Sequence, residues 1–175
     1  MRHEMSQRSF VLVLLAVAIL VPSLSASSGN FATDAFRKLQ SLEGNWEGRT
    51  QQGEPVKSYI SPIASNTAVI ETVSLGGDEM VSLYSVNANS ILLVHYCATN
   101  NQPRMRAIPA STPIQELVFS FEGAANLPSL AVGHERKLVI EFQDSDHITE
   151  RWTWRRDGKD TDMVFRLARV HFSRN

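Results

Sequence analysis

The sequence has a single cysteine, no marked excess of either charge, and none of the common catalytic or nucleotide-binding motifs. Cys97 has no partner for an internal disulfide. GxxxxGK, GxGxxG, HExxH, GxSxG and CxxC are all absent, which argues against the nucleotide, hydrolase, zinc-protease and redox sites that they mark. Lys and Arg number 17 against 18 Asp and Glu, and the two signs are interspersed. Without a basic cluster, we expect no nucleic-acid partner.

The first 26 residues have the pattern of a secretory signal peptide. MRHEMSQR carries two arginines, residues 10–21 form an apolar stretch, and Pro22 precedes the small residues SLSASS. A membrane-spanning helix needs about 20 consecutive apolar residues, so this shorter run predicts a cleaved signal rather than an anchor. With cleavage near Ala26, we expect an exported protein, periplasmic or extracellular, without a stable membrane anchor.

Residues 27–175 are predicted to form one domain that opens with a short amphipathic helix. Phe36, Leu39 and Leu42 recur at three-residue intervals. Thr33 or Asp34 is the expected N-cap, and Gly44 is the expected stop signal.

After the helix, the hydrophobic period changes to two, which indicates β-strands. Most connections, such as LGGDE, NANS and RDGKDTD, are short and rich in turn-forming residues, so neighbouring strands should be antiparallel. The longer segment GAANLPSLAVGHERK is expected to be a loop or a short helical turn over an opening. The predicted strands cover residues 45–50, 56–63, 67–75, 79–87, 90–98, 103–109, 115–122, 137–144, 147–156 and 161–170.

A meander of about ten strands has two edges to protect, and closure into an up-and-down barrel removes both. We therefore predict an all-β protein, an antiparallel up-and-down barrel of about ten strands, with an opened or flattened half-barrel as the alternative. Alternation predicts which apolar side chains face the interior. They are Leu117, Phe119, Phe121, Leu138, Ile140, Phe142, Met163, Phe165 and Leu167.

The run LEGNWEG, with Gly44 and Trp46 at the start of the first expected strand, resembles the opening Gly-x-Trp motif of lipocalins and related calycin barrels. In those barrels an arginine of the last strand packs over the tryptophan. The resemblance implies this role for Arg169, although Arg166 lies nearby on the other face.

A wider likeness covers most of residues 27–175. LEGNWEG, EMVSLYSV, HYCATNNQPRMR, EGAANL, GH and DSDHITERWTWRRDGKD together resemble a bacterial secreted family of lipocalin-like proteins of unknown function. Members carry a second histidine two residues after the one in GH, where this chain has Arg136. If that pair binds a metal, half of the pair is missing here. The resemblance implies a lipocalin-like barrel and supplies no activity.

The segment HYCATNNQPRMR is the first candidate site. In the strand SILLVHYC, His95 and Cys97 share one face. A thiol beside an imidazole can become a nucleophile, and the following amides and Arg104 can bind a carbonyl or carboxylate. Alternatively, Cys97 fills space, His95 satisfies a backbone group, and NNQP forms a turn. Because no carboxylate is placed by sequence to orient the histidine, we favour recognition over catalysis.

The segment ITERWTW is the second candidate site. Alternation places Glu150, Trp152 and Trp154 on one face, and the intervening threonines and arginines on a solvent face. A carboxylate on an aromatic interior face must be paired or protonated. Arg104, Arg106 or Tyr84 are its possible partners in a structural pair, and a polar group of a ligand is the alternative.

His95, His134 and His147 are the candidate ligands of a metal or haem. Nothing in their spacing makes them converge, so no metal and no cofactor is expected.

The sequence thus predicts an exported lipocalin-like barrel that binds a small, partly apolar molecule, with a binding site at His95, Cys97, Arg104, Glu150, Trp152 and Trp154. Two alternatives stay open: an enzyme of unknown reaction that uses His95 and Cys97, and a filled barrel with a structural or interaction role. The oligomeric state is not predicted.

Overall fold

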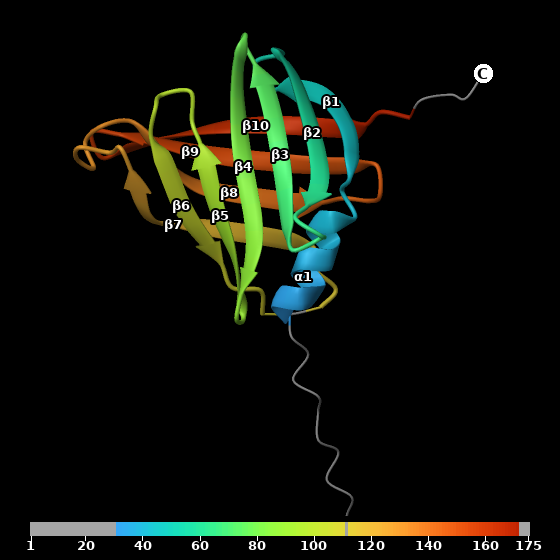
Figure 1. Cartoon of the computed structure of the whole chain (residues 1–175). Helices are drawn as coiled ribbons and strands as arrows, with labels where there is room; N and C mark the ends of the chain where they lie inside the picture. The colour runs from blue at the N-terminus through green and yellow to red at the C-terminus, as the bar shows by residue number, and fades with distance from the viewer. Residues whose placement is uncertain (1–30, 111, 172–175) are drawn as a thin grey trace, which may run out of the picture.

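The computed structural model describes residues 31–110 and 112–171. The predicted signal peptide lies outside the described residues. Within them, ten strands form a closed barrel in which each strand pairs antiparallel with its neighbours in sequence, and the last strand pairs with the first (Figure 1). The elements are α1 (Phe31–Gln40), β1 (Gly44–Thr50), β2 (Pro55–Ile63), β3 (Ala68–Leu75), β4 (Asp78–Asn87), β5 (Ser90–Tyr96), β6 (Gln102–Ala107), β7 (Glu116–Ala125), β8 (His134–Phe142), β9 (His147–Arg156) and β10 (Lys159–Arg169).

The predicted fold class is confirmed: the described chain is an all-β closed barrel preceded by one short helix. The half-barrel alternative is wrong, because β1 and β10 pair from Trp46–Arg169 to Thr50–Phe165 and leave no edge. The expected N-cap of the helix is wrong. Thr33 and Asp34 lie inside α1 rather than at its N-cap, because the helix already includes Phe31 and Ala32 and buries Ala32.

The long segment between the seventh and eighth strands is shorter than the sequence suggested. β7 continues to Ala125 and β8 begins at His134, so only residues 126–133 connect them. Their pairing partners explain the extension, because Gln102 of β6 pairs with Ala125 and Arg155 of β9 pairs with His134.

The turn sequences act as their composition predicts. Asp157 and Gly158 join β9 to β10 with φ values of 50° and 73°. Positive φ at both central residues matches the twist of a two-residue hairpin, and glycine adopts it without steric penalty.

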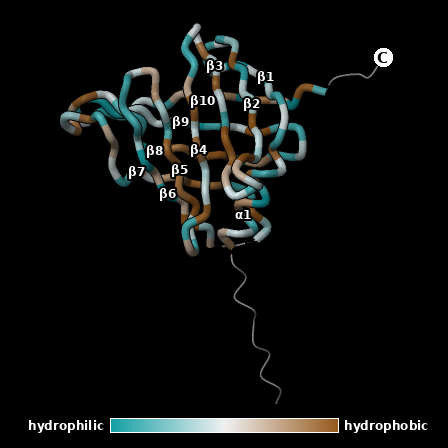
Figure 2. The backbone as a smooth tube through the Cα atoms, viewed as in Figure 1, coloured by the Kyte–Doolittle hydropathy of each residue, from teal (hydrophilic) through white to brown (hydrophobic). Residues whose placement is uncertain are grey.

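Hydrophobic and hydrophilic residues are interspersed along the strands (Figure 2), and many of the hydrophobic ones are buried in the barrel interior. Leu117, Phe119, Leu138, Ile140 and Leu167 are at most 2% exposed. These are positions that alternation assigned to the interior, and burial of their apolar surface is the main stabilising contribution.

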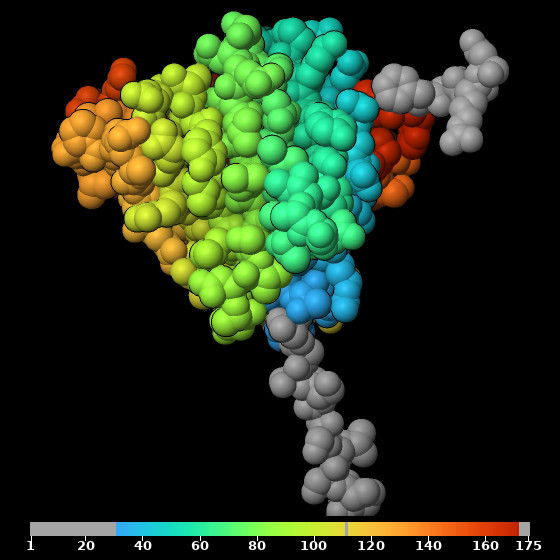
Figure 3. Space-filling view, in the orientation of Figure 1, coloured from blue at the N-terminus to red at the C-terminus, as the bar shows by residue number. Residues whose placement is uncertain are grey.

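Helix α1 lies at one end of the barrel, where the turns β2–β3 and β4–β5 also lie (Figures 1 and 3). It buries Ala35, Phe36 and Leu39. Just after it, the carbonyl of Leu42 accepts a hydrogen bond from Trp46 Nε1 at 2.8 Å. This end of the barrel is therefore closed by packed side chains.

Arg169 takes the position that the Gly-x-Trp resemblance implied. Its guanidinium carbon lies 4.4 Å from the centre of the Trp46 ring. The same group donates hydrogen bonds to the carbonyls of Ser41, Glu43 and Ser145. Arg169 thus ties the helix exit and the β8–β9 turn to the last strand.

Among the described residues, no helix is both long enough and apolar enough to cross a membrane.

Candidate functional site

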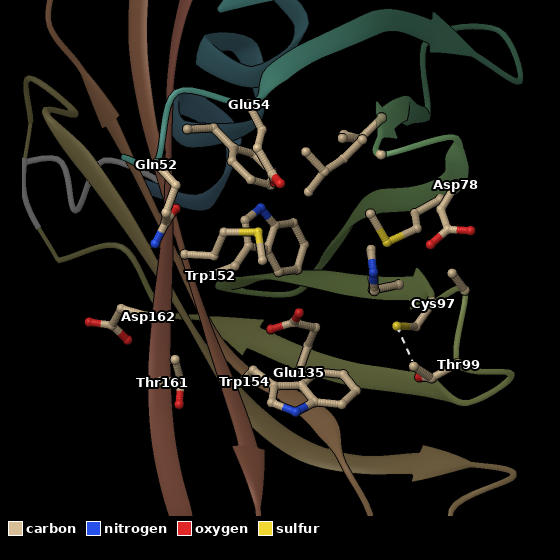
Figure 4. Close-up of a pocket in the computed structure, with 18 of the residues that line it drawn as sticks. Gln52, Glu54, Asp78, Cys97, Thr99, Glu135, Trp152, Trp154, Thr161 and Asp162 are labelled. Atoms are coloured by element: carbon tan, nitrogen blue, oxygen red, sulfur yellow. Dashed lines mark hydrogen bonds between the residues drawn. The ribbon is translucent and has the colours of Figure 1, made fainter. Parts of the chain in front are cut away.

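A pocket of about 690 Å³ opens at the end of the barrel opposite α1. The β1–β2, β3–β4 and β5–β6 turns form part of its rim, and β8, β9 and β10 supply the remaining wall (Figure 4). Apolar side chains deeper in the barrel, among them Val73, Met80 and Phe165, line the inner part. The interior is thus packed at the helix end and hollow at the other.

His95 and Cys97 both line this pocket, on one face of β5 and its continuation, as alternation predicted. The His95 ring packs against the Trp152 ring with 4.6 Å between centres, and its Nδ1 lies 3.0 Å from Ser82 Oγ. Cys97 is half-buried, and its sulfur accepts a hydrogen bond from Thr99 Oγ1 at 3.1 Å.

This arrangement gives weak support to nucleophilic catalysis. Burial lowers the pKa of His95 to about 4, so the imidazole is neutral at pH 7 and a poor base for a thiol. Its hydrogen-bond partner is the Ser82 hydroxyl rather than a carboxylate that would orient and charge it.

Trp152 and Trp154 line the pocket from β9, whereas Glu150 of the same strand lies below it in the core. Parity predicted an interior Glu150, and the structure places it there with 0% exposure. Trp152 Nε1 donates to Glu150 Oε2 at 3.0 Å. Through this hydrogen bond, Glu150 in the core fixes the orientation of the Trp152 indole that lines the pocket.

Glu150 belongs to a buried polar cluster with Glu71. Tyr84 donates to Glu71 Oε2 and Ser58 donates to Glu71 Oε1, both at 2.8 Å. Burial, and then the nearby charge of Glu71, raise the pKa of Glu150. The same two causes, with Glu150 as a further charge, raise the pKa of Tyr84. Tyr84 was foreseen as a partner of Glu150; its hydrogen bond goes instead to Glu71.

Arg104 does not lie in the pocket. It is exposed on the outer face of β6, because Pro103, Met105 and Ala107 occupy the inward positions of that strand. Arg106 also faces outward and forms an ion pair with Glu122. Alternation applied to residues 103–107 would have revealed this. The pocket residues that the sequence pointed to are therefore His95, Cys97, Trp152 and Trp154.

Glu135 is the pocket residue that sequence reasoning missed. The register of β8 against β9 shifts between Glu135 and Lys137, which leaves Arg136 as an extra residue. Alternation back from Leu138 would place Arg136 inward, but the irregularity reverses the parity and Glu135 lines the pocket. No turn residue or glycine inside the strand marks this shift, so the sequence carries no clear signal of it.

The Glu135 carboxyl is shielded although the residue as a whole is half-buried. Its Oε2 atom is out of contact with solvent and has no hydrogen-bond partner among the described residues. Burial raises the pKa of this carboxyl to about 8. In the empty pocket at pH 7 it is mostly protonated.

The remaining histidines do not join the site. His134 is buried behind the wall, with Nδ1 2.7 Å from the Val132 carbonyl and its ring against Phe121. His147 is exposed and pairs with Asp144. No group of three or more His, Cys, Asp or Glu side chains suited to a metal occurs in the part of the chain that the structure describes.

Comparison with known proteins gives a fold and no activity. No protein-family model matches the chain, and no curated protein matches it in sequence. A solved structure of a protein of unknown function from the DUF3598 family of Nostoc punctiforme is similar, with a TM-score of 0.51 and 12% identity. The match covers 75% of this chain and 49% of that one, so this chain spans about half of its length. At this identity the likeness supports the barrel fold alone.

Proposed function

We propose that the protein is an exported, lipocalin-like barrel that binds a small, partly apolar molecule in the pocket opposite α1. The main observation in favour of this proposal is a cavity of about 690 Å³ that has aromatic walls and contains the Glu135 carboxyl, whose shielded Oε2 has no hydrogen-bond partner among the described residues. Pockets for small ligands span roughly 300–1,000 Å³ and combine apolar walls with a few polar groups that fix orientation.

The packing of the barrel supports binding rather than a purely structural role. Interiors of folded proteins leave few voids larger than a water molecule. Here the helix end obeys that rule, whereas the opposite end keeps Trp152 and Trp154 beside open space. Large aromatic side chains at an open cavity are available to contact a ligand.

A neutral fluorophore, N-phenyl-1-naphthylamine, tests the proposal without assuming a charge on the ligand. We expect saturable 1:1 binding to residues 27–175, and about a tenfold weaker affinity in Trp154→Ala, because the ligand loses an indole contact. Tyr96→Ala is the matched control, since Tyr96 is 47% exposed and lies on the outer face of β5.

Native mass spectrometry of the protein purified from the exported fraction supplies the second readout. A discrete extra mass in the native spectrum supports a carried ligand. A bare mass together with no saturable binding of the fluorophore would overturn the proposal in favour of a structural or interaction module.

A further inference from the structure

The charged groups that line the pocket all have one sign. Among residues 31–110 and 112–171, no lysine or arginine lines it, and His95 supplies the single imidazole. This imidazole is neutral at pH 7 because burial lowers its pKa to about 4. Three exposed carboxylates lie around the mouth, and one shielded carboxyl lies further in. These four residues are Glu54, Asp78, Asp162 and Glu135. An anionic ligand would meet repulsion here, with no cation to offset its loss of hydration.

Glu135 is the strongest recognition group among them. Asp162 already accepts a hydrogen bond from Thr153 Oγ1 at 2.7 Å, and the carboxylates at the mouth are exposed to water. The Oε2 atom of Glu135, in contrast, has lost its water and gained no partner. A buried polar atom without a partner is costly, so a ligand group that bonds to it recovers that free energy.

The surroundings of Glu135 suit a cation. Glu135 is the cross-strand partner of Trp154, and Trp152 lies on the same face two residues along β9. The close-up shows the Glu135 carboxyl beside the Trp154 indole, with Trp152 on the same wall of the pocket (Figure 4). Indole faces attract ammonium groups, and the attraction grows when water is excluded.

The inner part of the pocket suits an apolar chain or ring. Val73, Met80 and Phe165 line it, and the two methionines, Met80 and Met163, are flexible enough to adapt to an irregular shape. A ligand held by its charge at Glu135 would therefore bury its apolar part towards the barrel core.

We infer that the ligand is an amphiphilic cation, with an amine or quaternary ammonium group bound by the Glu135 carboxylate beside Trp154 and an apolar portion inside the barrel. This inference rests on the proposed function and adds the chemical class of the ligand. A neutral ligand that accepts a hydrogen bond from protonated Glu135 is the competing chemistry that the experiment separates.

Binding of such a cation is coupled to a proton. Ion pairing favours the carboxylate, so a quaternary ammonium displaces the proton that Glu135 holds in the empty pocket at pH 7. Affinity should therefore increase as the pH rises towards 8 and level off above it.

Other titratable or charged groups also lie around Glu135 and its pocket. The lining residues among them are Glu54, Asp78, His95, Cys97 and Asp162. His134 and Arg136 are adjacent to Glu135 on β8, and Arg156 lies near Gly133.

Three ligands with the same eight-carbon chain test the inference: octyltrimethylammonium, 1-octanol and octanoate. Calorimetric titration at pH 8 compares them on residues 27–175, on Glu135→Gln, and on the control Glu141→Gln. Glu141 lies on the same strand but pairs with Arg151 on the outer face. We expect the ammonium to bind at least about tenfold more tightly than octanol, and octanoate to bind most weakly.

The variants decide what Glu135 does. Glu135→Gln should abolish the preference for the ammonium, whereas Glu141→Gln should keep it. Proton release at pH 7, measured in two buffers of different ionisation enthalpy, should occur in the unsubstituted protein and vanish in Glu135→Gln.

Equal or tighter binding of octanol or octanoate would overturn the cationic ligand and leave the binding function standing. An ammonium preference that survives Glu135→Gln would overturn the assigned role of Glu135. If none of the three binds, the inference fails, and the neutral fluorophore then decides independently whether the pocket binds at all.

Discussion

The buried glutamates at the two ends of the barrel differ in their surroundings, because only Glu135 lines a cavity. In the packed core, Glu71 accepts hydrogen bonds from Ser58 and Tyr84. Glu150 accepts one at Oε2 from Trp152, while its Oε1 has no partner among the described residues. At the open end, Glu135 Oε2 has no partner among the described residues. Burial raises the pKa of both Glu150 and Glu135, yet only Glu135 faces a cavity. Neither a raised carboxyl pKa nor an unpartnered oxygen by itself points to a binding group, because Glu150 has both and lies in the core; the cavity beside Glu135 is what makes Glu135 the candidate.

The largest expected effect tests whether side chains at the helix end of the barrel contribute more to the free energy of unfolding than those at the open end. Trp46→Ala removes a ring that is 0% exposed and packs under Arg169. We expect a loss of about 3–5 kcal/mol in the free energy of unfolding, measured by urea denaturation. Trp154→Ala at the open end should lose roughly 1–2 kcal/mol or less, because that indole is only half-buried. Equal losses would mean that the two ends are equally packed.

The second effect tests the hydrogen bonds of the partnered glutamate in the core, Glu71. Glu71→Ala leaves Tyr84 and Ser58 without their acceptor, and we expect a loss of about 1–3 kcal/mol for each donor left unpaired. Ser58→Ala removes a donor instead and should cost less. Thermal melting of both variants checks the order, and an inverted order would contradict the view that Glu71 organises the cluster.

The pH dependence of the melting temperature of Glu135→Gln tests the buried carboxyl at the open end. The pKa of Glu135 rises to about 8 on folding, so the folded state binds the extra proton and wild-type stability falls between about pH 4.5 and pH 8. Glutamine cannot ionise and should therefore raise the melting temperature relative to wild type at pH 9 more than at pH 5. A shift of a few degrees corresponds to about 1 kcal/mol. A difference that does not change with pH would show that Glu135 carries no folding-linked proton.

Adding one methyl group at Gly133 tests whether the position of the Trp154 indole affects ligand affinity. A Cβ added at Gly133 would lie 2.2 Å from Trp154 Cζ2, so Gly133→Ala must displace the indole. We expect about a tenfold loss of affinity for the neutral fluorophore, because the wall moves. The exposed neighbour variant Ala131→Ser should bind normally. Unchanged affinity in Gly133→Ala would exclude Trp154 from the ligand contact.

The smallest effect concerns Cys97. Its thiol is half-buried on the pocket wall, so a bound ligand should slow its alkylation by iodoacetamide several-fold. The rate is measured by mass spectrometry with and without fluorophore, and with a free thiol as reference. Alkylation much faster than that of the free thiol would instead favour the alternative in which Cys97 acts as a nucleophile with His95.

Several features of the pocket followed from alternation within single strands. SILLVHYC placed His95 and Cys97 on one face, and ITERWTW placed Trp152 and Trp154 on one face. These assignments needed only the period of two along regular strands. Arg104 was misplaced although the same rule puts it outside, with Met105 inside.

Glu135 could not be found in this way, because one extra residue, Arg136, reverses the parity between Leu138 and the start of β8. Such an irregularity is specified by pairing with β9 rather than by the residues of β8 themselves.

The sequence by itself determined an antiparallel meander of ten alternating strands joined mostly by short turns. It favoured closure, which removes the edges, but the pairing of β1 with β10 in the tertiary structure excluded an open half-barrel. The tertiary structure decided which interior positions are packed and which line a cavity. Helix α1 and Trp46 fill one end, while register and a strand irregularity bring Glu135 to the open end. Periodicity encodes the side of a sheet on which a residue lies, whereas the space beside that residue depends on strands and turns distant in the chain.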